Sequence, residues 1–116
     1  MPRRKQQITY THALPAAAEQ VLQQWGRNIA TARLRRQWRQ RDLAERAGIT
    51  RATVIAIEQG RPGTGAGAYV AVLWALGLHE DVAQLAAPDR DAEGATLEAA
   101  RLGTRARRSA PLDDDF

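Results

Sequence analysis

Residues 40–60 read QRDLAERAGITRATVIAIEQG, and this stretch decides the fold of the chain. Its first part, residues 40–47, is polar except for three apolar residues that fall on one side of a two-turn helix, Leu43, Ala44 and Ala47. We expect Gly48 to end this helix, because glycine readily takes the left-handed conformation that a helix end often needs.

A second helix is expected after a turn of only three residues. Thr50 is a favourable N-cap residue, and Ile49 and Val54 stand at the two positions of a hydrophobic staple. The helix should run to about Gln59 and end at Gly60. Because the turn is too short for antiparallel packing, the two helices must cross steeply, and the sequence predicts a helix-turn-helix.

In such a motif the second helix projects its N-terminal side chains into the major groove of DNA, while the first lies across the backbone. Arg51 is the first residue of that second helix. Its guanidinium can reach O6 and N7 of one guanine, which is worth about 1 to 3 kcal/mol of base discrimination. The competing interpretation is a small helical bundle whose tight turn serves packing alone. The basic charge around the motif favours DNA binding.

Charge is distributed unevenly along the 116 residues, whose net charge is +4. Sixteen of the seventeen basic residues are arginine, whose planar fork suits phosphates and base edges. Residues 21–80 hold nine Arg and four acidic residues, a net of +5, whereas residues 81–116 hold five Arg and eight acidic residues, a net of −3. The central part is therefore expected to meet a polyanion, and the last part a different partner.

The whole pattern predicts one all-α domain of five helices at 21–88, between an N-terminal arm (1–20) and a C-terminal tail (89–116). The first helix is expected at about Val21–Gln37, and residues 14–20 could open it because alanine propagates helices well.

The segment downstream of the motif begins with a glycine-rich loop at 60–67. A fourth helix at about 68–76 is apolar nearly all round, so we expect it to be the most buried segment. A short fifth helix at about 80–87 should stop before Pro88, and the tail holds an amphipathic stretch at 95–102.

Several function classes are excluded by composition. The chain has no cysteine, and its two histidines, His12 and His79, lie far apart, so we expect no metal site and no cofactor. No nucleophile, base and orienting group stand at a useful spacing, so we expect no enzyme and no small-molecule substrate. No apolar run is long enough to span a membrane, and Met1–Gln6 does not lead into an apolar signal segment. We therefore expect a cytoplasmic protein.

Ordinary structural roles are expected for several conspicuous side chains. The tryptophans, Trp25, Trp38 and Trp74, should lie in the core rather than stack on single-stranded bases. Arg46 and Asp42 are spaced for an ion pair within one helix. About half of the arginines around the motif are expected to approach phosphate, and the rest to form a solvated face; these residues are Arg35, Arg36, Arg39, Arg41 and Arg46.

The stretch 40–60 resembles the Cro/C1-type (XRE) helix-turn-helix family, which has the lambda repressor-like fold. The resemblance covers about residues 25–78 and rests on the pair Leu43–Ala44, on Gly48, Thr50 and Val54, and on the ending Ile57–Glu58–x–Gly60. It implies that Gln40 binds a phosphate or an adjacent base. It also implies that Gln59 and Arg61 lie at the DNA backbone and that the following residues face the bases: Thr50, Arg51, Ala52, Thr53 and Ala56.

The same resemblance implies a structural ion pair between Arg33 and Glu58, which would tie the first helix to the third. Two positions depart from the family pattern. Arg39 stands where Ser or Thr often caps the second helix, so the cap should be weaker, and Arg39 is expected to join the DNA-binding residues instead. Ile55 stands where a small polar residue is common.

The last third of the chain is similar to HipB-like regulators, which are antitoxins encoded with HipA-type serine/threonine kinase toxins. The similarity runs from Leu73–Leu78 through Ala87–Asp89, Asp91, Gly94 and Leu97 to Arg101 and Arg105–Arg107, although Gly103–Thr104 replaces a more usual Pro–Lys or Pro–Arg pair. It implies a homodimer that represses its own operon at a palindromic operator and holds the kinase inactive.

A dimer surface is predicted on the apolar residues of the fourth and fifth helices, Trp74, Leu78, Val82 and Leu85. Two-fold symmetry would be mirrored in operator half-sites about 34 to 36 Å apart. Two alternatives remain open. One is a stand-alone XRE-family or phage-type regulator without a toxin, and the other is a protein-interaction module that does not bind DNA.

Overall fold

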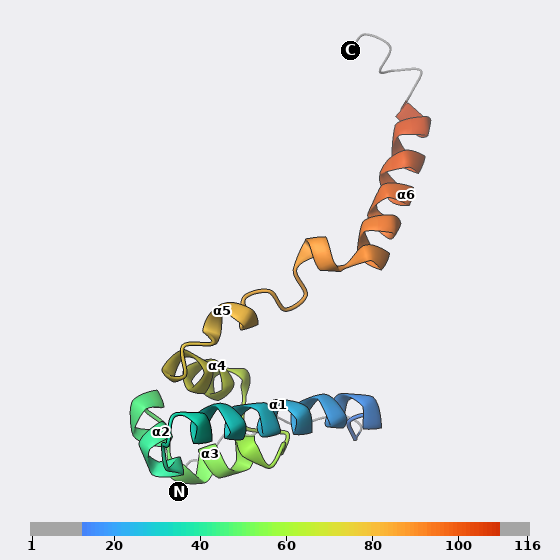
Figure 1. The fold of residues 1–116 in the computed structure, drawn as a ribbon. Helices are drawn as coiled ribbons and strands as arrows, with labels where there is room; N and C mark the ends of the chain where they lie inside the picture. Colours follow the sequence, from blue (N-terminus) through green and yellow to red (C-terminus); the bar gives the residue numbers. More distant parts are fainter. Residues whose placement is uncertain (1–12, 110–116) are drawn as a thin grey trace, which may run out of the picture. The chain divides into compact units, whose positions relative to one another are not determined.

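The computed structural model describes residues 13–109, and these residues form helices and loops without a strand (Figure 1). The all-α prediction is confirmed. The elements are α1 (Ala16–Arg35), α2 (Gln40–Ala47), α3 (Arg51–Glu58), α4 (Ala66–Ala75), α5 (His79–Val82), the 3-10 turn η1 (Pro88–Arg90) and α6 (Ala92–Ser109). Most of the predicted N-terminal arm and the last seven residues of the tail lie outside the described range.

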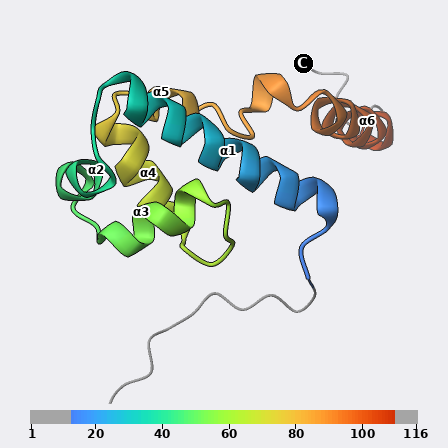
Figure 2. The same cartoon turned by 60° about the horizontal axis from the view of Figure 1, so that its bottom comes forward.

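The chain divides after Val82 into two compact units. In the first unit, α2 packs against α3 and α4, and α1 packs against α3. Figure 2 views α2 almost along its axis and α3 from the side, which shows the steep crossing expected of the motif. One core lies between these helices, with side chains from all four: Ile29, Ala32, Leu43, Ala44, Val54, Ile57, Tyr69, Val72 and Leu76.

The first four helices end in the same way. After each helix one residue adopts a positive φ, and the N–H of the next residue donates to the carbonyl five positions back, as in a Schellman motif. Three of these residues are glycines, Gly48, Gly60 and Gly77, and the first two confirm the predicted helix ends, whereas α1 uses Gln37 at φ 58°.

The first helix begins at Ala16. Residues 16–20 therefore open the helix, as their alanines indicated, and do not belong to the arm that was expected to extend to residue 20. Pro15 precedes the helix with φ −57°, and its carbonyl accepts from the N–H groups of Ala18 and Glu19. Proline with the alanines that follow therefore nucleates the first turn, because neither residue type opposes helical φ.

The prediction that the fourth helix is the most buried was wrong. Only Tyr69 and Val72 of α4 are buried, while Val70 is 42% and Trp74 is 60% exposed. A helix packed through one face buries only that face, whatever the composition of the other. The fifth helix is also shorter than predicted and ends at Val82, before a turn that extends to Ala86.

The second unit contains α6, which is longer than the amphipathic stretch predicted at 95–102. Asp91 caps it, since its Oδ1 accepts from the N–H of Gly94 at 2.9 Å. None of the helices within residues 13–109 is long and apolar enough to cross a membrane.

Close contact between α1 and α3 depends on Gly26, whose role no local sequence pattern indicates. A Cβ at this buried position would lie 2.5 Å from the carbonyl oxygen of Glu58 and 2.6 Å from that of Ile57. Both neighbours are main-chain atoms, so the two helices could accept a side chain only by moving apart.

We expect Gly26→Ala to destabilise the domain by about 1 to 3 kcal/mol through overpacking, even though alanine favours a helix. Gly67→Ala is the matched control, because Gly67 also lies in a helix and a Cβ there meets nothing within 4 Å. Urea unfolding followed by circular dichroism measures both. Equal stabilities of the two variants would contradict the close contact.

Candidate nucleic-acid interface

The motif's second helix, α3, begins at Arg51 as predicted, with Thr50 as its N-cap. The Thr50 Oγ1 accepts from the N–H of Thr53 at 3.2 Å, and the hydroxyls of these two residues lie 2.8 Å apart in a hydrogen bond. Both hydroxyls therefore help to hold the first turn of the helix. Arg51, at the first helical position, is exposed.

One side of α3 is open to solvent and the other is in the core. Val54 and Ile57 are fully buried. Ala52 and Gln59 are exposed and Ala56 is half-buried, at spacings of four and three residues that place them on one stripe. Thr53 and Ile55 are half-buried, and Arg61 is exposed beyond the helix. The small side chains on the open stripe would allow the helix backbone to approach a surface closely.

An open pocket of about 600 Å³ lies beside the start of α3. Its lining consists of four arginines and one amide, Arg33, Arg39, Gln40, Arg41 and Arg51. Three helices contribute, because Arg33 belongs to α1, while Gln40 and Arg41 form the first turn of α2. A concave surface lined by guanidinium groups and no carboxylate suits an anion such as a phosphate.

Arg33, which also lines this pocket, forms with Glu58 the ion pair that the family resemblance implied. Arg33 Nε donates to Glu58 Oε2 at 2.7 Å, and Nη2 donates to Oε1 at 3.0 Å. Arg33 Nη1 donates to the carbonyl of Trp38 at 2.8 Å. The side chains are 11% and 8% exposed, so this fork is largely withdrawn from water.

Gln40 belongs to the same network. Its Nε2 donates to Glu58 Oε1 at 3.1 Å, which leaves one amide hydrogen and the amide oxygen for another partner. The implied phosphate contact of Gln40 stays a prediction. The hydrogen bond fixes the side chain at the edge of the arginine-lined pocket.

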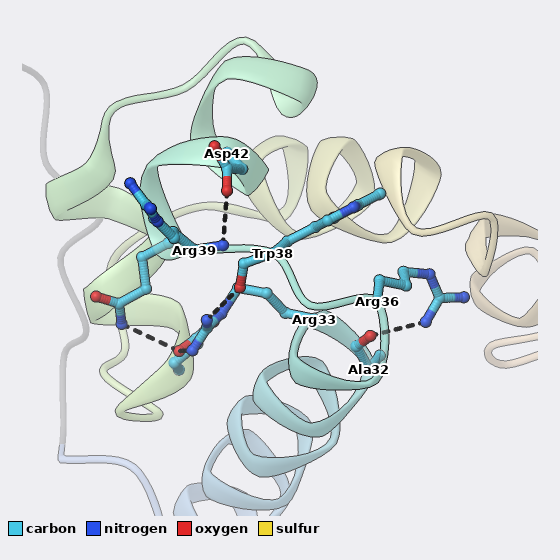
Figure 3. Close-up of polar contacts among 8 residues, drawn as sticks. Ala32, Arg33, Arg36, Trp38, Arg39 and Asp42 are labelled. Atoms are coloured by element: carbon cyan, nitrogen blue, oxygen red, sulfur yellow. Dashed lines mark hydrogen bonds and ion pairs between the residues drawn. The ribbon is translucent and has the colours of Figure 1, made fainter.

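The N-terminus of α2 is capped without the help of the Arg39 side chain. A guanidinium has no acceptor, and the cap comes instead from Asp42, whose Oδ2 accepts from the Arg39 N–H at 2.8 Å (Figure 3). This carboxylate takes the reciprocal part of a capping box. The Arg39 guanidinium is thereby left to line the pocket.

Two arginines near the motif serve different roles from those expected. The ion pair predicted between Arg46 and Asp42 was wrong, because Arg46 lies over the Trp38 ring at 4.1 Å from its centroid, a cation–π contact. Arg36 donates to the carbonyls of Ala32 and Leu76, at 2.8 and 2.9 Å, and so joins the ends of α1 and α4 rather than being a freely solvated side chain.

The tryptophans divide into two groups. Trp25 and Trp38 pack against the core, as predicted, and Trp25 makes an edge-to-face contact with Tyr69 at a centroid distance of 5.6 Å. The core role predicted for Trp74 was wrong, since its side chain faces solvent.

The residues predicted for a dimer surface lie in both units. Leu78 and Val82 are half-buried and Trp74 is exposed in the first unit, whereas Leu85 belongs to the second and is 56% exposed. The structure therefore groups three of the four in one unit. The dimer assignment stays a prediction.

A family model described as Helix-turn-helix domain matches residues 24–86, which is more than half of the chain. The chain belongs to the helix-turn-helix family. The match begins within α1, covers α2 to α5 entirely and is of the XRE-like type. A search of curated proteins found no match. Membership in this family indicates DNA binding and a role in regulating transcription.

The burial of the Arg33–Glu58 ion pair leads to a prediction about the free energy of unfolding. Arg33→Met should cost about 3 to 5 kcal/mol, because it leaves the Glu58 carboxylate buried with Gln40 as its remaining side-chain partner. The double variant Arg33→Met, Glu58→Leu should lose less than the sum of the single variants, since no charge is then stranded.

Arg27→Met is the control for lost methylene packing and lost charge. Arg27 also lies on α1 but is exposed and donates only to Gln24 in the described structure, so its replacement should change stability by less than about 0.5 kcal/mol. Urea titrations measure the stability of Arg33→Met, Glu58→Leu and the double variant, which form the cycle with the unsubstituted chain, and of the control Arg27→Met. A loss in Arg33→Met no larger than in Arg27→Met would refute the role of the pair.

Proposed function

We propose that this chain is a sequence-specific transcriptional repressor that reads an operator with α3. The observation that carries this proposal is the exposed Arg51 at the start of α3, beside a pocket to which two further exposed arginines contribute, Arg39 and Arg41. A projecting fork suits a base edge, and a concave cluster of cations suits the phosphate backbone that flanks it.

The roles of the individual residues follow from their exposure. Arg51 would contact a guanine, and Ala52 and Ala56 would let α3 lie deep in the major groove. Arg39, Arg41 and the free part of the Gln40 amide would bind backbone phosphate at the pocket. Exposed side chains at the other end of α3, Gln59 and Arg61, would contact the backbone. No cofactor and no chemical reaction are part of this function.

A homodimer on a palindromic operator is the proposed binding form. One α3 offers few contacts, so two copies related by a two-fold axis would be needed for affinity. The exposed side of α4 supports such an interface, because Val70 and Trp74 lie one turn apart there, with 42% and 60% exposure. Leu78 and Val82 of the same unit would extend this surface.

At a finer level we propose a HipB-like antitoxin that represses its own operon and neutralises a HipA-type kinase in the cytoplasm. The support is the sequence similarity of residues 73–107 to such regulators.

A stand-alone regulator is the alternative, and it predicts that the segment from Asp89 onward is dispensable for repression. Copurification with the product of a neighbouring kinase gene tests the antitoxin function. A protein that binds its operator fully but captures no such kinase would be the stand-alone regulator.

Two arginine variants separate base reading from backbone binding. Arg51→Ala should relax the preference at one operator position, at a cost of about 1 to 3 kcal/mol, because it removes a bidentate base contact. Arg61→Ala should weaken binding to all sequences alike and reduce the slope of log K against log salt by about one.

Gel-shift titrations on operator variants at two salt concentrations measure both effects. Identical behaviour of Arg51→Ala and Arg61→Ala would refute the assignment of roles. Full activity of a variant lacking both Arg51 and Gln40 would favour the third candidate, an interaction module that does not bind DNA.

A further inference from the structure

The open side of α3 carries its hydrogen-bonding side chains only at the two ends of the helix. Arg51 stands at the start and Gln59 just beyond the last residue, and both are exposed. Between them the residues on the open side are apolar, since Ala52 is exposed and Ile55 and Ala56 are half-buried. The middle of the helix therefore presents methyl groups to a surface that lies against it.

The other polar side chains of α3 already have partners inside the domain. The hydroxyl of Thr53 lies 2.8 Å from that of the N-cap Thr50 in a hydrogen bond, and Thr50 Oγ1 also accepts from the Thr53 N–H. The carboxylate of Glu58 is held by Arg33 in the largely buried ion pair. Reading of a base edge by hydrogen bonds therefore falls to Arg51 at the start of the helix.

The base edges in the major groove differ in what they offer to a methyl group. Thymine carries a C5-methyl group there, whereas the edges of adenine, guanine and cytosine present hydrogen-bond donors and acceptors without one. A methyl group placed against the thymine methyl buries apolar surface. Against a polar edge it displaces water without replacing the hydrogen bonds of that water. Alanine at such a position therefore favours thymine.

We propose that Ala52 and Ala56 select thymine at the operator positions that they face. This inference rests on the proposed reading of DNA by α3 and adds the chemical group that is read. Arg51 would select one guanine through hydrogen bonds, and the two alanines would select thymines through contact with the C5-methyl groups. The alanines lie four residues apart, about 6 Å along the helix, so they would face different base pairs.

Replacement of thymine by uracil tests this selection, because uracil pairs with adenine in the same way and lacks only the methyl group. Selection of random-sequence duplexes by the full chain first supplies the operator. In that duplex, uracil at one thymine at a time should weaken binding about fourfold where an alanine contacts the methyl group, as expected for uncovering one such group. The remaining thymines are the controls and should show no change. At a sensitive position, 5-methylcytosine should bind more tightly than cytosine by a similar factor.

Glycine variants identify the side chain that makes each contact. Ala52→Gly and Ala56→Gly should each abolish the difference between thymine and uracil at one position and keep it at the other. This difference is a ratio of two affinities of the same variant, so a lower helix stability does not change it. Arg51→Ala is the matched variant. Measured at low salt, where binding is tighter, it should keep both differences while it loses the preference for guanine.

Three outcomes would overturn the inference. Equal binding of the thymine and uracil duplexes at every position, by a chain that still selects one sequence, would overturn it and leave the proposed function intact. A preference for thymine that persists in both glycine variants would show that the methyl group acts through the shape of the DNA and not through contact with α3. A chain that selects no sequence at all would overturn the proposed function and this inference with it.

Discussion

The bidentate contact between Arg33 and Glu58 is the interaction on which the first unit depends. Arg33 lies near the end of α1, Glu58 ends α3, and the same carboxylate accepts from Gln40 at the start of α2. The third arm of the guanidinium donates to the Trp38 carbonyl in the turn between α1 and α2. One fork thus fixes three helices and the turn, in a setting where a stranded charge would be costly. This contact therefore also helps to maintain the steep angle between α2 and α3.

This network also shapes the surface in front of it. Because Glu58 is occupied by Arg33 and Gln40, its negative charge is compensated inside the domain and does not line the pocket. The cap of α2 has a similar consequence. Asp42 supplies the acceptor that Arg39 lacks, so an arginine can occupy a capping position without leaving the helix end unsatisfied. The two carboxylates thereby stabilise the helices and leave the arginines available for an anion.

The helix-turn-helix could be predicted from the sequence because its helix ends depend on interactions between residues that are close along the chain. Glycines at 48, 60 and 77 end helices through their own backbone freedom, and Thr50 caps α3 through an atom only three residues from its partner. The errors concern features set by distant packing. No local pattern tells whether another part of the fold covers Trp74. Arg46 contacts Trp38, eight residues away across the turn before α2, rather than Asp42, four residues away in its own helix. Gly26 matters because a main-chain carbonyl from α3 approaches it, and no local pattern records that approach.

The two units differ in the apolar side chains that they bury. The core around Leu43, Val54 and Ile57 draws side chains from four helices, whereas the two large apolar side chains of α6, Leu97 and Leu102, are both exposed. The position of α3 therefore depends on the buried contacts of the first unit, which include the Arg33–Glu58 ion pair. Because those contacts lie within one compact unit, a substitution in α6 need not disturb the geometry with which α3 would read DNA.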